Sequence, residues 1–250
     1  VPLAFDLSKL IKTKHPDIKI VWGGIHPILF PEQTLRNPNI DIVVTGEGYH
    51  ATLSLIDYLN GKIGLRQVRG VGFKDDSGNV VLNEPSESDD IGTLPHIDYS
   101  ILEDIELYLS SKSVYQRELA GNNNERLDVM LVLTGLGCCY KCQFCINVIL
   151  KRSYRFRPAA SIIEEIKKLQ ENYGANTFIF YDEDFFINKR RLFEFLDLIE
   201  RENLKFFWRA WARVDYFNNK YIDRDLVLRL ERCGLRSMEM GGESGSQKVL

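Results

Sequence analysis

The sequence predicts an α/β protein whose functional groups lie at one edge of a parallel sheet. Two observations support this class. In the first region, short apolar runs end in glycine and lead into helical patterns, as in "DIVVTGEG" followed by "YHATLSLIDYLNG". From residue 126 onward, four apolar runs alternate with three amphipathic stretches of helical period. Such alternation is typical of consecutive βα units.

The composition is that of an ordinary globular chain and excludes several classes of protein. Lysine and arginine total 32 against 35 acidic residues over 250 positions, so no broad basic surface for nucleic acid or anionic lipid is expected. No apolar run approaches the roughly 20 residues that cross a bilayer, and the N-terminus lacks the pattern of a signal peptide. We expect a cytoplasmic protein whose five cysteines form no disulfide framework.

The first region combines two strand–helix units with a hairpin. The spacing of Leu3, Leu7 and Leu10 predicts a helix, which the apolar run of "IKIVWGG" follows as a strand. A second strand in "DIVVTGEG" leads into a helix that stops at Gly61. Residues 68–84 carry two β-prone runs around "DDSGN", which predict a hairpin that we interpret as a closing flap. Residues 85–125 are typical of a connection with one short helix.

The second region predicts a parallel sheet with functional groups at the carboxyl ends of its strands. A capping box from Ser161 to Glu164 opens the first helix, and Gly174 closes it. Asn188 starts the second helix. The strands and helices alternate over residues 127–137, 161–174, 176–186, 188–203, 204–215, 223–234 and 237–246.

Residues 135–146 read "GLGCCYKCQFCI" and hold two overlapping cysteine spacings. Cys138, Cys142 and Cys145 form C-x-x-x-C-x-x-C, whereas Cys139 with the last two forms C-x-x-C-x-x-C. Four thiols crowded into a loop after a strand predict metal binding. Structural zinc would need four ligands, and all four histidines lie in the first region. The ferredoxin run needs a further cysteine followed by proline, which is absent. Three thiolates can hold a [4Fe-4S] cube and leave its fourth iron open.

At these residues the sequence resembles the radical S-adenosylmethionine (SAM) superfamily, whose C-x-x-x-C-x-aromatic-C loop follows the first strand of a (β/α) barrel. The resemblance implies that Cys138, Cys142 and Cys145 are the metal ligands. Cys139 stands where relatives commonly have proline and is expected to be a bystander. Phe144 is expected to shield the cluster from water and to lie where an adenine binds.

The resemblance extends to the ends of the later strands and implies contacts to SAM there. Asp182 and Glu183 in "FYDEDFF" would accept hydrogen bonds from the methionyl amino group. In "WRAWARVD", Arg213 would meet the carboxylate of SAM, although a salt bridge with Asp215 is the alternative. The last strand ends in "GGESGSQKVL", which resembles the family's G-x-E-S-G-S-x-x-x-L. The resemblance implies that Glu243 and Ser244 face the ribose or methionyl portion of SAM.

"IVWGGIHPILFPEQTL" followed by "DIVVTGEG" resembles the C-terminal half of a cobalamin-binding (B12-binding) Rossmann-like domain. Glycines at strand ends let a corrin or its nucleotide tail approach the backbone. The candidate residues are Gly23 and Gly24, then Gly46 and Glu47. His26 is expected to be a loop histidine rather than a cobalt ligand.

Together these resemblances imply an α/β fold in which the C-terminal half of a Rossmann-like cobalamin-binding domain precedes the first four βα units of a partial (β/α) radical-SAM barrel. The expected domains are 1–84 and 126–250, joined by a linker over 85–125. The implied protein is a cobalamin-dependent radical SAM enzyme. Its [4Fe-4S] cluster would cleave SAM reductively to a 5′-deoxyadenosyl radical, used for methylation, cyclisation or rearrangement of an unknown small molecule or peptide.

The implied cofactors are the [4Fe-4S] cluster, SAM and cobalamin, and the implied electron donor is a protein such as flavodoxin or ferredoxin. Two alternatives stay open from the residues alone. One is an iron–sulfur electron-transfer or redox-sensing module that uses Cys139, Cys142 and Cys145, with Cys233 as a fourth ligand. The other is a non-catalytic zinc scaffold.

Overall fold

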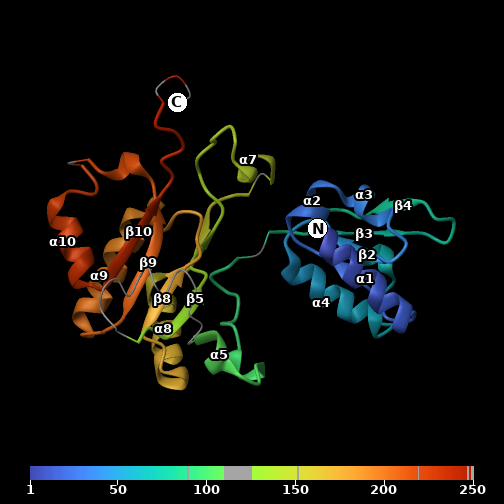
Figure 1. Cartoon of the computed structure of the whole chain (residues 1–250), viewed down its shortest axis with the longest axis horizontal. Coiled ribbons are helices and arrows are strands. Elements are labelled where there is room, and N and C mark those ends of the chain that lie inside the picture. The colour runs from blue at the N-terminus through green and yellow to red at the C-terminus, as the bar shows by residue number, and fades with distance from the viewer. Residues whose placement is uncertain (89, 110–125, 151, 219, 247, 249–250) are drawn as a thin grey trace. The chain divides into compact units, whose positions relative to one another are not determined.

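The structure is a computed structural model that describes every residue except 89, 110–125, 151, 219, 247 and 249–250. It divides into two compact units, Val1–Asp89 and Asp90–Leu250, each with its own sheet (Figure 1). The later part of the expected linker and the last residues of "GGESGSQKVL" therefore lie outside the described residues. No helix in the described ranges is long and apolar enough to cross a membrane.

The first unit contains a four-stranded sheet in the order β1-β2-β3-β4. Strands β1 and β2 are parallel, and the hairpin β3–β4 continues the sheet in the antiparallel sense. The elements are α1 (Pro2–Lys14), β1 (Val21–Trp22), α2 (Ile25–Leu29), α3 (Pro31–Leu35), β2 (Ile42–Val44), α4 (Gly48–Leu59), η1 (Leu65–Gln67), β3 (Val71–Lys74) and β4 (Val80–Leu82).

The hairpin prediction is confirmed, but its interpretation as a flap is wrong. Strand β3 pairs along its length with β2, and its side chains Val71 and Phe73 are buried. They pack with Val44 of β2 and with Leu55 of α4 in one apolar cluster. The hairpin is therefore part of the sheet and of its core.

The second unit contains a four-stranded, fully parallel sheet in the order β10-β9-β8-β5. The predicted alternation of strands and helices is confirmed. The elements are η2 (Tyr99–Ile101), α5 (Ile105–Leu109), β5 (Val129–Val132), β6 (Gly135–Leu136), α7 (Ile146–Leu150), β7 (Arg155–Phe156), α8 (Ala159–Tyr173), β8 (Thr177–Phe180), η3 (Phe185–Ile187), α9 (Lys189–Arg201), β9 (Phe207–Ala212), η4 (Val214–Tyr216), α10 (Arg224–Arg232) and β10 (Leu235–Met240).

Helices α8, α9 and α10 share one apolar core with the sheet of the second unit. Alternate strand residues face this core, because side chains alternate between the two faces of a strand. Burial of each large apolar side chain stabilises the unit by about 1.5–3 kcal/mol. The buried residues of the strands and helices include Met130, Val132, Phe178, Phe180, Trp208, Ala210, Ile162, Ile166, Phe195, Leu196, Leu226 and Leu230.

The helix ends agree with the sequence signals except at the start of α8. Asn188 and Asp223 cap α9 and α10 by accepting hydrogen bonds from backbone N–H groups. Gly174 closes α8 in the left-handed conformation. The predicted capping box is wrong: α8 begins at Ala159 after Pro158, so Ser161 already lies inside the first turn. The hydroxyl and carbonyl of Ser161 accept hydrogen bonds from Arg157 instead.

Candidate functional site

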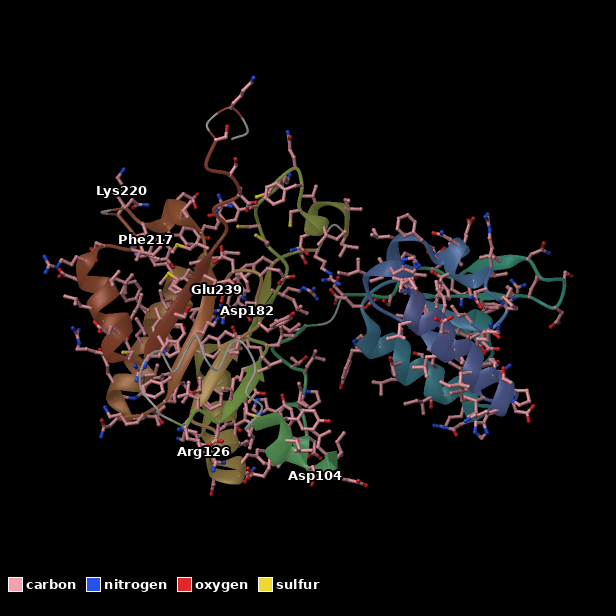
Figure 2. The ribbon with its side chains drawn as sticks, in the orientation of Figure 1. Asp104, Arg126, Asp182, Phe217, Lys220 and Glu239 are labelled. Carbon is pink, nitrogen blue, oxygen red and sulfur yellow. The ribbon has the colours of Figure 1, made fainter. Side chains whose placement is uncertain are left out.

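The carboxyl ends of β5, β8, β9 and β10 meet at one edge of the sheet, because all four strands run in the same direction. The cysteine loop follows β5 and β6 at this edge. Figure 2 shows Asp182, which follows β8, well away from Arg126, which precedes β5 at the opposite edge. The polar residues after each strand therefore surround one region.

The four crowded cysteines differ in exposure. Cys138, Cys142 and Cys145 are half-buried, whereas Cys139 is exposed. This difference favours the C-x-x-x-C-x-x-C spacing, since a thiol that points to solvent does not converge with the other three. Across the described ranges, no group of three His, Cys, Asp or Glu side chains is close enough to hold a single metal ion. Three half-buried cysteine thiols are a donor set of the kind that holds an iron–sulfur cluster.

Cys233 lies at the other edge of the sheet. It follows α10 and precedes β10, is buried, and its carbonyl accepts a hydrogen bond from Trp208 Nε1 at 2.9 Å. The six residues of β10, at about 3.3 Å each, separate this position by roughly 20 Å from the carboxyl edge. Cys233 therefore does not complete a ligand set with the cysteine loop.

Two carboxylates hold the start of the cysteine loop. Asp182 accepts hydrogen bonds from the backbone N–H of Thr134 at 2.7 Å and of Gly135 at 2.8 Å. Glu183 accepts one from the backbone N–H of Gly137 at 2.9 Å, directly before Cys138. Burial raises the pKa of Asp182, against the opposing effects of Arg191 and of these donors. The two residues that the sequence assigns to SAM thus also contact the loop that bears the thiols.

Arg213, at the end of β9, contacts the middle of the cysteine loop. Its guanidinium lies 3.8 Å from the ring centroid of Tyr140 and 3.7 Å from the Cys142 sulfur. It also forms a two-pronged salt bridge with Asp215, at 2.9 and 3.0 Å. This ion pair holds the pKa of the Asp215 carboxyl below its usual value. The salt bridge with Asp215 that was the alternative is thus formed, and contact of Arg213 with the carboxylate of SAM stays a prediction.

Asp184 is a buried carboxylate that the sequence interpretation did not assign to the site. It accepts hydrogen bonds from the Tyr216 hydroxyl at 2.7 Å and from the Phe186 backbone N–H at 3.0 Å. Burial raises the pKa of Asp184 to about 6. Its position shortly after the largely apolar run "TFIF" was the available signal, but its partner Tyr216 lies 32 residues away in the chain.

The raised pKa of Asp184 predicts a pH-dependent stability. Because the folded chain binds the proton more tightly than the unfolded chain, the stabilisation is complete below the ordinary pKa of 3.8 and is lost as the pH rises through about 6. The loss is on the order of 2–3 kcal/mol. The measurement is the free energy of unfolding of the metal-free chain in urea at pH 4 and at pH 8. The stability of Asp184→Asn relative to the wild type should increase by this amount from the lower pH to the higher. An equal difference at both pH values would contradict burial as the cause. Asp197→Asn, on the exposed face of α9, is the surface control.

The remaining candidates of the second unit lie in open positions. Phe144 is 72% exposed, and its role in shielding the cluster stays a prediction. Glu243 is exposed and has a φ of 50°, in the left-handed region that few non-glycine residues adopt. Ser244 is half-buried, and its N–H donates to the Gly242 carbonyl at 2.6 Å. Within the described part of the chain, no hydrogen bond or ion pair joins Glu243 or Ser244 to Asp182 or Glu183.

The glycine candidates of the first unit lie at one edge of its sheet. Because β1 and β2 are parallel, Gly23 and Gly24 after β1 lie at the same edge as Gly46 and Glu47 after β2. Gly24 has a φ of 90°, and a side chain built there would meet nothing within 4 Å. The backbone at this edge is therefore open to a flat ligand at Gly24.

Comparison with known proteins identifies both units. Residues 132–250 match the Radical SAM superfamily, and residues 1–56 match the B12 binding domain. The chain is 28% identical over 251 residues to an uncharacterized methyltransferase of Pyrococcus horikoshii, covering 99% of this chain and 50% of that protein. It is 27% identical over 248 residues to the anaerobic magnesium-protoporphyrin IX monomethyl ester cyclase of Rubrivivax gelatinosus, covering 97% and 41%. The chain thus spans half or less of the length of these relatives.

A solved structure shares the fold of both units. The cobalamin-dependent SAM radical enzyme OxsB, with aqua-cobalamin and SAM bound, superposes with a TM-score of 0.75 at 22% identity, covering all of this chain and 35% of OxsB. The fold is that of a radical SAM domain preceded by part of a B12-binding domain. The chain therefore carries a radical SAM domain together with a B12-binding domain. The radical SAM domain implies a [4Fe-4S] cluster and SAM as cofactors, and the B12-binding domain implies cobalamin.

Proposed function

We propose that this chain is the cofactor-binding part of a cobalamin-dependent radical SAM enzyme. The observation that carries the proposal is the cysteine loop at the carboxyl edge of the parallel sheet. Three of its thiols are half-buried while the fourth is exposed, and the ends of two neighbouring strands contact the loop. Cys138, Cys142 and Cys145 would hold the cluster in this arrangement. When bound, the cluster supplies an electron to SAM, and cleavage of SAM yields a 5′-deoxyadenosyl radical.

The protein's own residues bind and orient the cofactors. Glu183 offers an acceptor to the methionyl amino group, and Arg213 offers donors to the carboxylate of SAM. Phe144 supplies an exposed ring for the adenine. Glu243 and Ser244 lie on the open segment after β10, within the same carboxyl edge, and are assigned to the ribose or methionyl portion. Asp182 is left out of this set, because both of its carboxylate oxygens already accept hydrogen bonds from the protein.

Cobalamin is assigned to the first unit. Gly23, Gly24, Gly46 and Glu47 lie at the carboxyl edge of β1 and β2, and the open backbone at Gly24 suits close approach of a corrin or its nucleotide tail. The reaction is methyl transfer or a cyclisation or rearrangement, in line with the names of the relatives. The substrate is a small molecule or peptide, the electron donor is a protein of the flavodoxin or ferredoxin kind, and the setting is the cytoplasm.

The test is reductive cleavage of SAM by anaerobically reconstituted protein. With dithionite as reductant, release of 5′-deoxyadenosine or of S-adenosylhomocysteine is the expected result. Cys145→Ala, reconstituted in parallel, should release neither product. A wild-type protein that binds a cluster and accepts an electron reversibly, yet leaves SAM intact, would support the electron-transfer alternative and overturn the proposal.

A further inference from the structure

Arg191 is a buried arginine that the sequence interpretation did not single out. It projects from the first turn of α9, is only 2% exposed, and reaches the segment before the cysteine loop. Its guanidinium donates to the Thr134 carbonyl at 2.8 Å and to the Phe185 carbonyl at 2.9 Å. It also lies 3.4 Å from the Asp182 carboxylate, so the two charges form a buried pair. A buried charge of this kind is tolerated only when it is paired and hydrogen-bonded.

Asp182 completes the same arrangement from the end of β8. It accepts hydrogen bonds from the backbone N–H groups of Thr134 and Gly135, and a third from the Thr134 hydroxyl at 2.5 Å. Thr134 therefore has its N–H and hydroxyl held by Asp182 and its carbonyl held by Arg191. A side chain would not fit at position 135, since its first carbon would lie 2.8 Å from the Asp182 carboxylate.

A second buried pair supports the neighbouring residue. Arg157 pairs with Glu165 of α8, and both side chains are buried. The Arg157 guanidinium donates to the Leu133 carbonyl at 3.0 Å, and its backbone N–H donates to the Thr134 carbonyl at 2.9 Å. The carbonyls of two successive residues at the end of β5 thus accept from buried arginines. The chain is held in this way from Leu133 to Gly135, three residues before Cys138.

We propose that Asp182 and Arg191 are positioning residues for the cysteine loop. They fix the backbone of Thr134 and Gly135, and through it the place of the Cys138 thiol, rather than contacting SAM. The inference rests on the proposed function, because it takes the cysteine loop to be the segment that binds the cluster. Its geometric part, that the pair keeps Cys138 half-buried beside an exposed Cys139, holds for the metal-free chain as well.

The test compares the alkylation rates of Cys138 and Cys139 in the metal-free protein, read by peptide mass spectrometry. Cys139 is an internal reference, because its thiol is already exposed. In Asp182→Leu, which removes both acceptor oxygens, and in Arg191→Lys, the rate ratio of Cys138 to Cys139 should rise by about 10-fold or more, because opening of the loop becomes easier. After reconstitution, the same variants should retain iron about 10–100-fold less tightly against a chelator, as for other groups that orient metal ligands.

Two further variants separate positioning from general stability. Leu196→Ala removes a fully buried side chain of α9 that belongs to the apolar core, so it lowers the melting temperature without touching the loop. Its Cys138 to Cys139 ratio should equal that of the wild type. The double variant Asp182→Leu/Arg191→Met removes both charges and their hydrogen-bonding atoms, and it should recover stability lost in the single variants. Cys138 should stay as reactive as in the single variants, because neither side chain then holds Thr134.

An unchanged rate ratio in Asp182→Leu, with a melting temperature lowered as in Leu196→Ala, would overturn the inference and leave the pair a structural role only. Full recovery of the ratio in the double variant would overturn it too. If the wild type binds no iron while the ratio still rises in the variants, the proposed function fails and the positioning role stands. If the wild type binds iron and the ratio does not rise in the variants, the proposed function stands and the positioning role fails.

Discussion

Cys138→Ala is expected to abolish cluster binding, whereas Cys139→Ala should leave it intact. The two residues are adjacent, but Cys138 is half-buried with Cys142 and Cys145, and Cys139 is exposed. Removal of a direct ligand should lower iron retention by more than the about 10–100-fold that follows from changes in the surrounding residues. Iron and sulfide content, together with the visible absorption of the reconstituted proteins, measures the effect.

The adjacent alanine variants are matched controls for each other, since they make the same change at neighbouring positions of one loop. Cys233→Ala adds a control at the far edge of the sheet and should also keep its cluster. Loss of the cluster in Cys139→Ala, combined with retention in Cys138→Ala, would show that the other cysteine spacing is the correct one.

Gly137→Ala is the second substitution with a large expected effect. Gly137 has a φ of 77°, and a side chain there would lie 2.3 Å from the Ser153 carbonyl oxygen. The left-handed backbone and the clash with main chain together should cost at least about 3 kcal/mol. The N–H of Gly137 is also the donor to Glu183. We therefore expect both a lower free energy of unfolding, measured in urea, and loss of iron from the reconstituted protein.

Gly174→Ala separates the strain of a left-handed backbone from the clash with a neighbouring main chain. Gly174 is also left-handed, with a φ of 66°, but a side chain there meets nothing within 4 Å. Only backbone strain remains, about 1–2 kcal/mol, and the cluster should be unaffected. A Gly137→Ala protein that is no less stable than Gly174→Ala would mean that the Ser153 carbonyl moves aside at little cost.

The regular elements of the second unit were predictable because their signals are local. Apolar periodicity located β5, β8, β9 and β10, and Asn188, Asp223 and Gly174 marked helix ends through contacts within a few residues. The family resemblance of the cysteine loop set Cys139 apart from the other three thiols, and Cys139 is the exposed one of the four. Each of these features can be recognised within a single turn, strand or loop.

The arrangement beneath the cysteine loop was not predictable in the same way. Arg191 and Thr134 are 57 residues apart, and Asp182 and Thr134 are 48 apart. In the sequence, Arg191 looks like a surface residue of a basic first turn, "NKRR". The signal for its burial was its position next to Leu192, on the face of α9 that carries the buried apolar residues. The short pair β6–β7 was missed for a related reason, since a strand of two residues leaves no periodicity to detect.

The failed capping box shows how a tertiary contact overrides a local pattern. Ser161 and Glu164 have the right spacing, but Arg157 takes the Ser161 hydroxyl, and Glu164 pairs with Lys168 on the helix surface. Arg157 is itself fixed by Glu165 and by the Leu133 carbonyl. The start of α8 is therefore set by the same buried arginine that supports the strand before the cysteine loop.

The long chain separation of the Thr134 contacts also has a consequence for the order of assembly. Closing a chain segment of this length must precede the contacts that stabilise it, so such contacts form late in folding. The start of the cysteine loop is complete only after β8 has paired with β5 and α9 has docked on the sheet. Iron and sulfide delivered during synthesis would meet thiols without a fixed arrangement. We therefore expect cluster insertion to follow folding of the sheet from β5 through α9.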